Sequence, residues 1–410
     1  MSIDGAVSEL REVIRSEIDF GGAITDEELL RKTEEAVLNW CGQNPLPAAE
    51  KVNLVRRIYH SFRGLDVLQP LMDDPSVTEI MINSHEDIFV ERNGEMERHS
   101  VRFESRERLE DLIQHVVAEV NRVVNMSSPI VDARLRDGSR IHVVLPPIAL
   151  KGPCLTIRKF SDQPITLERL VQLGALSQEA ADFLRVLVEA KYNIFISGGT
   201  GTGKTTFLGA LSRYIPADER VVTIEDSAEL QIRTVPNLVS LETRNANTEG
   251  KGKIGIDDLI RASLRMRPNR IIIGEVRGAE AFDLLQALNT GHDGSISTGH
   301  ANSAKDMMLR LESMVMGGAE LPLPVIRAQI ASALDIVVHL SRFRDKTRKV
   351  AEICEVCGVQ EGEIRLKRLY HFEEEGERNG KVIGGLKATG ETLSNTDKLL
   401  LAGKGQYVKG

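Results

Sequence analysis

Apolar side chains recur at helical spacing through the first sixty residues of the chain. In the first segment they occupy every third or fourth position: Val7, Leu10, Ile14 and Ile18. This spacing predicts an amphipathic helix. A capping box, Thr25-Asp-Glu-Glu28, opens a second helical segment, and a third segment begins after Pro47. We therefore predict an N-terminal helical extension over residues 1–63.

The following stretch mixes short apolar runs with turn signals. Two such runs, Ile80-Met-Ile82 and Ile88-Phe-Val90, precede the turn pair Asn93-Gly94, and Asp137-Gly138 marks a second hairpin. A helical pattern lies between the two hairpins: Leu109, Leu112, Ile113, Val116, Val117, Val120 and Val124. Together these patterns predict a compact α+β N-terminal domain over residues 64–159.

A change of pattern follows at residues 160–174, where Ser161-Asp-Gln-Pro164 indicates a hinge linker. From Ala175 onward, apolar runs typical of buried strands alternate with helical patterns. The runs are Tyr192–Ser197, Arg220–Glu225, Arg270–Gly274, Ser295–Thr298 and Leu334–Val338. This alternation predicts an α/β domain built on a parallel sheet over residues 175–410.

The segment after the first of these runs has the residues of a phosphate-binding loop. It reads Gly198-Gly-Thr-Gly-Thr-Gly-Lys-Thr205 and fits the pattern G-x-x-x-x-G-K-[ST]. Glycines let backbone N–H groups curl around phosphate oxygens, Lys204 reaches the β- and γ-phosphates, and the Thr205 hydroxyl ligates Mg²⁺. A glycine turn with a purely structural role is the alternative. We expect ATP and Mg²⁺ to bind here, and the expected nucleotide-contacting residues are Gly198, Gly199, Thr200, Gly201, Thr202, Gly203, Lys204, Thr205 and Thr206.

Polar residues stand at the ends of three other predicted strands. Functional side chains in open α/β sheets lie at the carboxyl ends of strands. The residues at these positions are Glu225, Asp226, Glu275 and His300. Each alone is explained as a helix cap or a satisfied polar residue. Beside a phosphate-binding loop, they indicate one site.

Glu275 is the expected base that polarises the attacking water, because three consecutive isoleucines deliver it to the sheet edge. Gly274 precedes it, at a place where ATPases often carry an aspartate. Mg²⁺ is then expected to rely on Thr205, phosphate oxygens and water, with Glu225 or Glu275 acting through water. His300 is expected to hydrogen-bond the γ-phosphate, and a structural histidine is the alternative.

Arginines are expected to complete the site, since charge that builds on the transferring phosphoryl group needs cations from outside the loop. Six candidates lie around Glu275 in the sequence and three in the preceding domain: Arg244, Arg261, Arg265, Arg267, Arg270 and Arg277, then Arg134, Arg140 and Arg158. Most surface arginines are only solvated, which is the default for any single one. We expect two of the nine to be active-site groups supplied across an interdomain or intersubunit cleft.

Composition limits the class of protein. The chain has 410 residues, 41% of them hydrophobic and 27% charged, with a net charge of -8. This length favours two domains plus an appendage. The sequence has no run near the roughly 20 apolar residues of a membrane span and no secretory signal pattern, so we expect a cytoplasmic protein. The acidic balance argues against coating of nucleic acid.

Four cysteines occur in the chain: Cys41, Cys154, Cys354 and Cys357. They are too sparse for a disulfide framework. The pair Cys354-x-x-Cys357 lacks the second pair of ligands that a structural zinc site needs. Two small side chains in a strand are the simpler interpretation.

Five motifs together resemble those of the secretion and pilus-assembly ATPases. They are Gly198–Thr206, Glu225-Asp-Ser-Ala-Glu229, Gly274-Glu-Val-Arg-Gly278, Gly291-His-Asp-Gly294 and Gly299-His-Ala-Asn302. They correspond to the Walker A, Asp-box, Walker B and His-box elements of that superfamily. Three flanking segments narrow the resemblance to the CpaF type, the ATPases of tight-adherence (Flp) pili and close kin of the type IV secretion ATPases: Asp132-Ala-Arg-Leu-Arg-Asp-Gly-Ser-Arg140, Leu155-Thr-Ile-Arg-Lys-Phe160 and Leu264-Arg-Met-Arg-Pro-Asn-Arg270.

This resemblance implies a homohexameric ring. Each subunit would hinge an N-terminal sensing domain to a RecA-like motor domain and hold ATP in the cleft between them. Domain rotation on hydrolysis would move an integral-membrane platform protein, so that the ring is peripheral at the inner face of the cytoplasmic membrane. By position, Arg140 and Arg158 match arginines that such N-terminal domains bring onto the nucleotide, and Arg244 matches a candidate near the Asp box.

The leading interpretation is therefore an ATP-hydrolysing motor for pilus assembly or protein export, with a type IV secretion or conjugation ATPase as the alternative within the superfamily. A nucleic-acid motor would need strand-tracking loops rich in aromatics, but aromatics are 4% of the chain and Lys251-Gly-Lys253 is the one suggestive patch. We accordingly expect no direct contact with nucleic acid. A nucleotide switch that does not hydrolyse ATP is a further alternative, against which Glu275 argues.

Overall fold

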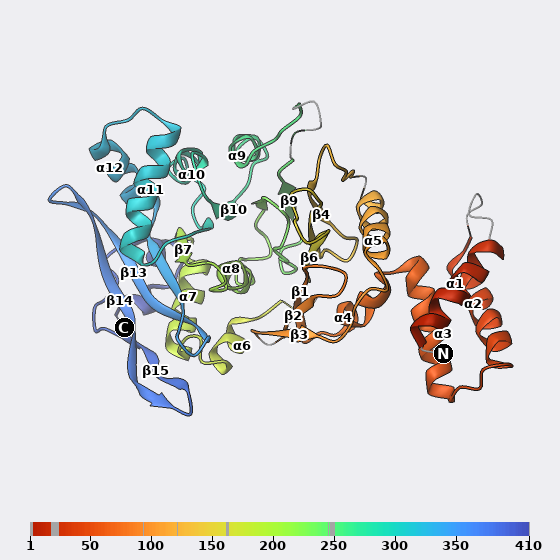
Figure 1. Cartoon of the computed structure of the whole chain (residues 1–410). Coiled ribbons are helices and arrows are strands. Elements are labelled where there is room, and N and C mark those ends of the chain that lie inside the picture. The colour runs from red at the N-terminus through yellow and green to blue at the C-terminus, as the bar shows by residue number, and fades with distance from the viewer. Residues whose placement is uncertain are drawn as a thin grey trace. The chain divides into compact units, whose positions relative to one another are not determined.

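Two compact units make up the chain, Met1–Asp162 and Gln163–Gly410 (Figure 1). The computed structural model describes residues 3–17, 24–92, 94–120, 122–160, 164–244, 246 and 251–409. Of the residues used in the sequence predictions, Ile18, Asn93 and residues 161–163 of the expected hinge linker lie outside these ranges.

The first unit begins with three helices, α1 (Ile3–Glu17), α2 (Asp26–Cys41) and α3 (Ala48–Arg63). Their apolar faces share one small core: Val7, Leu10, Ile14, Leu29, Val37, Leu54 and Ile58. At the start of α2, the Thr25 side chain accepts a hydrogen bond from the Glu28 N–H group at 3.2 Å. The three helices predicted from apolar spacing are therefore confirmed.

A six-stranded antiparallel sheet forms the rest of the first unit, in the order β3-β2-β1-β6-β5-β4. Its strands are β1 (Val77–Ile82), β2 (Ile88–Arg92), β3 (Glu95–His99), β4 (Ile130–Arg134), β5 (Arg140–Val144) and β6 (Cys154–Arg158). The short helices η1 (Asp66–Leu68) and α4 (Gln69–Asp73) precede the sheet, and α5 (Arg106–Glu119) shares its core. The α+β character predicted for this stretch is confirmed.

The helix α5 is shorter than its apolar pattern predicts. It ends at Glu119, although Val120 and Val124 continue the helical spacing. Val120, Val123 and Val124 are β-branched and weak helix formers. Val124 is nevertheless buried in the same core, and its carbonyl accepts a hydrogen bond from Gln114 Nε2 at 3.0 Å.

The second unit is built on a nine-stranded sheet in the order β15-β14-β13-β12-β7-β11-β10-β8-β9. The strands from β12 to β9 in this order are parallel: β12 (Ile336–Arg342), β7 (Ile194–Gly198), β11 (Ile296–Gly299), β10 (Arg270–Val276), β8 (Val221–Glu225) and β9 (Leu238–Glu242). The five strands predicted from apolar runs are all present. The sheet therefore has the parallel centre that the alternation of strands and helices predicts.

Helices cover both faces of this sheet (Figure 1). One face packs against α6 (Leu167–Gln172), α7 (Gln178–Glu189) and α8 (Lys204–Ser212). The other packs against α9 (Ile256–Ser263), α10 (Glu280–Leu288), α11 (Ala304–Gly318) and α12 (Leu323–Ala333). Helix α6 lies within the stretch expected to be a linker, with its Leu167 buried against the sheet.

A long antiparallel ribbon extends the sheet beyond the predicted strands. It consists of β13 (Arg348–Gln360), β14 (Glu363–Arg378) and β15 (Lys381–Ala388), and the short helices α13 (Asp397–Leu401) and η2 (Gly405–Lys409) follow it. Of this ribbon, the sequence predicts only the strand that contains Cys354 and Cys357. Within the described ranges, every helix is too short or too polar to cross a bilayer.

Candidate functional site

The phosphate-binding loop connects β7 to the first turn of α8. Gly201 and Gly203 have φ values of 71° and 93°, a region that favours glycine. At Gly198, a Cβ atom would lie 2.5 Å from the Leu340 carbonyl oxygen, so the close approach of two backbones also requires glycine. The loop thereby brings backbone N–H groups to the N-terminus of α8, an arrangement that binds anions.

Lys204 lies in the first turn of α8 with its side chain over this loop. Its Nζ donates to the Gly198 and Gly199 carbonyl oxygens, each at 3.1 Å, and lies 3.2 Å from His300 Nδ1. Burial lowers the pKa of Lys204, and the Glu275 carboxylate opposes this shift. A phosphate bound in the loop would compete for the same ammonium group.

Four neighbouring strands bring the predicted site residues to one edge of the sheet. In the order β7-β11-β10-β8, these strands are parallel, so their carboxyl ends meet at the same edge. The phosphate-binding loop follows β7, His300 follows β11, Glu275 lies near the end of β10, and Asp226 follows β8. The sequence prediction that these residues gather beside the loop agrees with their positions.

Glu275 contacts two of the predicted residues directly. Its Oε1 lies 2.6 Å from His300 Nε2, and its Oε2 accepts a hydrogen bond from Arg277 Nη2 at 2.8 Å. The preceding strand residues Ile271, Ile272 and Ile273 are fully buried, which fixes the position of the carboxylate at the sheet edge.

The His300 imidazole lies between the phosphate-loop lysine and the predicted base. Burial lowers the pKa of His300, the nearby Lys204 adds to this shift, and Glu275 opposes it. A neutral imidazole with its proton on Nε2 accepts from Lys204 through Nδ1, while Nε2 lies 2.6 Å from Glu275 Oε1 in a close contact without hydrogen-bond geometry. Lys204, His300 and Glu275 thus form one connected polar chain.

Arg277 extends this chain to the next strand. Its Nη1 lies 3.0 Å from Asp226 Oδ2, while its Nη2 binds Glu275. The hydrogen bond to Glu275 raises the pKa of Arg277. Of the nine candidate arginines, Arg277 is therefore one that contacts the predicted base.

Glu225 is buried beside this cluster, and its side chain binds backbone N–H groups. Its Oε1 accepts hydrogen bonds from the N–H groups of Glu229 at 2.9 Å and Leu230 at 3.1 Å. A Cβ atom at Gly274 would lie 3.0 Å from Glu225 Cγ. The glycine before Glu275 therefore makes room for Glu225, and a role of Glu225 in binding Mg²⁺ through water stays a prediction.

Three further predicted arginines, Arg140, Arg158 and Arg244, have partners of their own. Arg140 on β5 and Arg158 on β6 are direct cross-strand partners in the first unit, and Arg158 Nε lies 3.2 Å from Glu79 Oε1. In the second unit, Arg244 follows β9, and its Nε donates to the Gly252 carbonyl oxygen at 2.7 Å. Their roles toward a nucleotide stay predictions.

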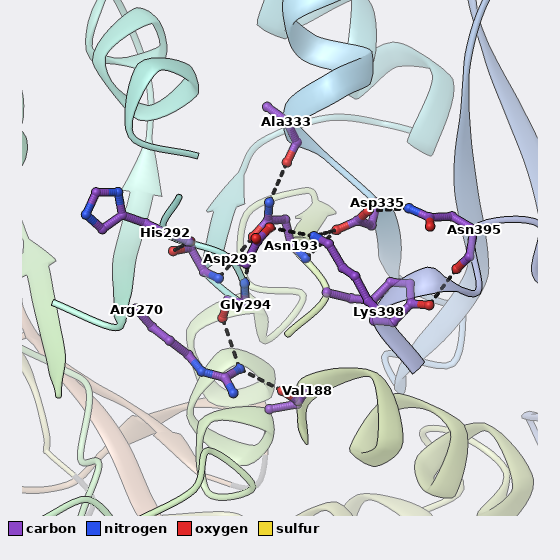
Figure 2. Close-up of polar contacts among 12 residues, drawn as sticks. Val188, Asn193, Arg270, His292, Asp293, Gly294, Ala333, Asp335, Asn395 and Lys398 are labelled. Atoms are coloured by element: carbon purple, nitrogen blue, oxygen red, sulfur yellow. Dashed lines mark hydrogen bonds and ion pairs between the residues drawn. The ribbon is translucent and has the colours of Figure 1, made fainter. Parts of the chain in front are cut away.

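Arg270 is at the opposite edge of the sheet, at the amino end of β10, so listing it among active-site candidates was wrong. It is fully buried and holds Glu219 through Nε at 2.5 Å and Nη2 at 3.0 Å. Its Nη1 donates to the carbonyl oxygens of Val188 at 2.6 Å and Gly294 at 3.2 Å (Figure 2). Burial alone would raise the pKa of Glu219, but Arg270 lowers it.

A second buried polar group lies at the same amino edge and joins segments far apart in the sequence. Asn193 Nδ2 donates to the Ala333 carbonyl oxygen at 2.8 Å, and its Oδ1 accepts from the Gly294 and Ser295 N–H groups (Figure 2). Asp335 Oδ2 accepts from the Asn193 N–H group at 2.8 Å. Two residues of the motif Gly291-His-Asp-Gly294, Asp293 and Gly294, take part in this network.

Lys398 of α13 completes this network. Its Nζ bridges Asp293 Oδ1 at 2.7 Å and Asp335 Oδ2 at 2.6 Å (Figure 2). Asn395 Nδ2 donates to Asp335 Oδ1 at 3.1 Å, and Tyr192 Oη donates to the Asn395 carbonyl oxygen at 2.5 Å. The segment after the ribbon is thereby tied to the centre of the sheet.

We expect Lys398→Met to destabilise the second unit by about 1–3 kcal/mol at neutral pH, because a buried carboxylate loses its cation. Burial already raises the pKa of Asp335, and Lys398 opposes that shift. An acid whose folded-state pKa lies above its unfolded value loses stability as pH rises past the unfolded value. The difference between variant and wild type should therefore grow in urea titrations as the pH rises above the unfolded-state pKa of Asp335.

The exposed Lys387 on β15 provides the control for this prediction, since its partners Glu373 and Glu375 are also exposed. Lys387→Met should change stability little over the same rise in pH. A Lys398→Met deficit that does not depend on pH would contradict the assignment of Asp335 as the unpaired acid.

The residues present fit Mg²⁺ bound together with phosphates. Thr205 lies half-buried in the first turn of α8, and carboxylates stand at the ends of β8 and β10. In the described ranges, no three His, Cys, Asp or Glu side chains are grouped so as to hold a metal ion. That Thr205, phosphate oxygens and water would hold Mg²⁺ stays a prediction. On β13, burial raises the pKa of the Cys354 thiol to about 12.

The fold and the loop define a P-loop nucleotide-binding protein of the α/β class. A family model for the type II/IV secretion system protein family matches residues 62–388, and the chain belongs to this family. A putative conjugal transfer protein of Mycobacterium tuberculosis is 36% identical over 326 residues, which cover 78% of this chain and 92% of that protein. The type IV secretion system protein VirB11 of Brucella suis is 35% identical over 303 residues, covering 67% and 84%.

Solved structures share the fold. The pilus retraction motor PilT with bound ADP superposes with a TM-score of 0.52 at 16% identity, covering 83% of this chain and 88% of that chain. The ATPase DotB of Legionella pneumophila superposes with a TM-score of 0.50 at 20% identity, covering 70% and 79%. These similarities confirm the predicted fold class, a RecA-like α/β domain preceded by a smaller α+β domain.

Proposed function

We propose that the protein is an ATP-hydrolysing motor of a secretion or pilus-assembly machine. The observation that carries this proposal is the connected chain Lys204, His300 and Glu275, because it joins the phosphate-binding loop to a carboxylate placed for a water molecule. A nucleotide switch would need the loop but would have no use for this carboxylate.

The side chains suggest how turnover proceeds. Phosphates in the loop draw the Lys204 ammonium away from the Gly198 and Gly199 carbonyl oxygens. Since His300 Nδ1 contacts the same ammonium, the position of Lys204 also affects His300. Glu275 exchanges its Arg277 contact for the attacking water and orients it toward the γ-phosphate. Mg²⁺, when bound, neutralises charge on the phosphates. Arg277 is then free to stabilise the charge that develops.

The remaining parts of the proposal follow from the family. We propose a homohexamer of the CpaF type that acts in the cytoplasm on integral-membrane platform proteins. The motifs of the sequence support this assignment, while the conjugal transfer and VirB11 relatives support a type IV secretion or conjugation motor as the second candidate. Arg140, Arg158 and Arg244 are proposed to supply further cations to the phosphates.

ATP hydrolysis by the purified full chain tests the proposal. Phosphate release should require Mg²⁺, and its rate per subunit should rise with protein concentration because a ring must assemble. Lys204→Ala should lower turnover by about 10²-fold or more and weaken nucleotide binding, because the loop loses its charged donor. The exposed Lys305→Ala, whose side chain is 75% accessible, should behave like wild type.

Wild-type protein that binds ATP but releases no phosphate at any concentration would contradict a motor. That result would favour the nucleotide switch instead. Equal turnover by Lys204→Ala and wild type would show that a contaminating ATPase produced the signal.

A further inference from the structure

A cavity of about 430 Å³ lies in the second unit, away from the residues of the predicted nucleotide site. Its walls come from α7, from β14, from the end of β15 and from the segment that follows the ribbon. Phe183 and Tyr370 form part of one wall, with ring centroids 5.3 Å apart, and Leu369, Leu393 and Tyr407 add apolar surface. A preformed cavity of this size and character is typical of a ligand site.

The charged groups on this cavity all have the same sign. Glu179, Asp182 and Glu391 line it, whereas the described residues that line it include no lysine, arginine or histidine. At the rim, Asp182 pairs with Arg185 at 3.2 Å and accepts a hydrogen bond from Gln178. Glu179 and Glu391 are exposed, so each carboxylate is accessible to an incoming cation.

The phenol of Tyr370 adds a polar group without charge. Its Oη donates to Glu179 Oε1 at 3.4 Å, and burial raises the pKa of Tyr370 to about 12. The phenol therefore stays neutral and its ring stays available as an aromatic wall. Aromatic faces beside carboxylates attract cations more strongly than either group alone.

The walls are held in place by the network at the amino edge of the sheet. Leu399 and Tyr407 belong to α13 and η2, and Lys398 of α13 bridges Asp293 and Asp335. Lys404 forms an ion pair with Glu189 near the end of α7. These contacts tie α13 and the chain after it to the sheet and to α7, and walls ordered in this way lower the entropy cost of binding.

We infer that this cavity binds a lysine- or arginine-bearing peptide segment of a partner protein. The long apolar stems of these side chains suit the walls, and their cationic heads suit the exposed carboxylates of Glu179 and Glu391. The inference rests on the proposed function in one respect, the identity of the partner. Cytoplasmic loops of membrane proteins carry an excess of Lys and Arg, so a basic loop of the membrane platform is the expected occupant.

Fluorescence polarisation of the full chain with a labelled peptide tests this inference. The probe is a nine-residue peptide that alternates Leu with Lys and Arg, and the control probe carries Glu in place of its cations. The basic peptide should bind and the acidic one should not. Glu391→Gln combined with Tyr407→Ala should weaken binding by about tenfold, because both a carboxylate and an aromatic wall are lost.

A matched double variant on β14 controls for general attraction to an acidic protein. Glu363→Gln with Glu375→Gln removes one more exposed carboxylate than the cavity variant does, away from the residues that line the cavity. Equal loss of affinity in both variants would overturn the inference. So would a cavity variant that changes self-association, measured by light scattering, without changing peptide affinity, because a second copy would then be the occupant.

ATP turnover separates failure of this inference from failure of the proposed function. Neither Glu391 nor Tyr407 belongs to the nucleotide site, so the cavity variant should keep basal turnover, which also shows that it folds. Turnover without cavity-dependent peptide binding overturns the inference alone. Cavity-dependent peptide binding without turnover supports a docking site and overturns the motor.

Discussion

Glu275→Gln is expected to reduce the rate of ATP hydrolysis by about 10²- to 10⁴-fold while nucleotide binding stays close to that of wild type. The amide keeps the size of the side chain but cannot polarise a water molecule as a carboxylate does. His300 Nε2 and Arg277 Nη2 lose a charged acceptor, yet neither residue belongs to the phosphate-binding loop. Phosphate release and equilibrium binding of a fluorescent ATP analogue measure the two effects separately.

The exposed Glu363→Gln is the matched control and should hydrolyse ATP at the wild-type rate. Loss of ATP binding together with turnover in Glu275→Gln would mean that the carboxylate supports the fold of the site and not the chemistry. A variant that keeps more than about a tenth of wild-type turnover would move the role of base to a neighbouring carboxylate, with Asp226 the first choice.

Arg270→Met is expected to cause the largest loss of stability, about 3–5 kcal/mol in the second unit. The variant leaves Glu219 buried beside Lys191, at 3.6 Å, and removes the Arg270 donor from the Val188 and Gly294 carbonyl oxygens. Hydrogen exchange of the β10 amides, together with urea unfolding, measures this loss.

A double-mutant cycle separates loss of the ion pair from loss of packing. Arg270→Met combined with Glu219→Gln should be less destabilised than Arg270→Met alone, because no charge then remains buried. Arg261→Met provides the exposed control, since Arg261 pairs with Asp257, Asp258 and Asp283 at a half-exposed position. Additive losses in the cycle would show that Arg270 acts through packing alone.

Much of the second unit could be predicted because its signals are local. Runs such as Ile271, Ile272 and Ile273 are apolar on both faces, which is typical of a strand buried between two layers of helices. Most of the ribbon β13-β14-β15 could not be predicted, because its sequence lacks such apolar runs. Much of β14 is exposed, and residues such as Glu373, Glu374 and Glu375 follow one another without an apolar partner to set a period of two.

The sequence could predict that the active-site residues lie at strand ends beside the loop, but not which of their side chains contact one another. Strand ends placed Glu275 and His300 beside the loop, whereas the chain from Lys204 through His300 to Glu275 depends on rotamers that no pattern encodes. Arg270 and Arg277 show the same limit. They flank one strand, and only the direction of β10 places Arg277 at the site and Arg270 at the far edge.

The network at the amino edge could not be predicted because its partners are distant in sequence. Asn193 and Asp335 are 142 residues apart, and Lys398 is 63 residues beyond Asp335. Each residue alone is an ordinary polar residue in a loop or a short helix. Only the assembled sheet brings these residues together.

The position of Lys398 near the end of the chain also determines when its ion pair with Asp335 can form during translation. A ribosome makes Asp335 before Lys398, so during translation the buried carboxylate lacks the cation that pairs with it in the finished fold. The ion pair between Asp335 and Lys398 therefore forms only after α13 has emerged from the ribosome and docked.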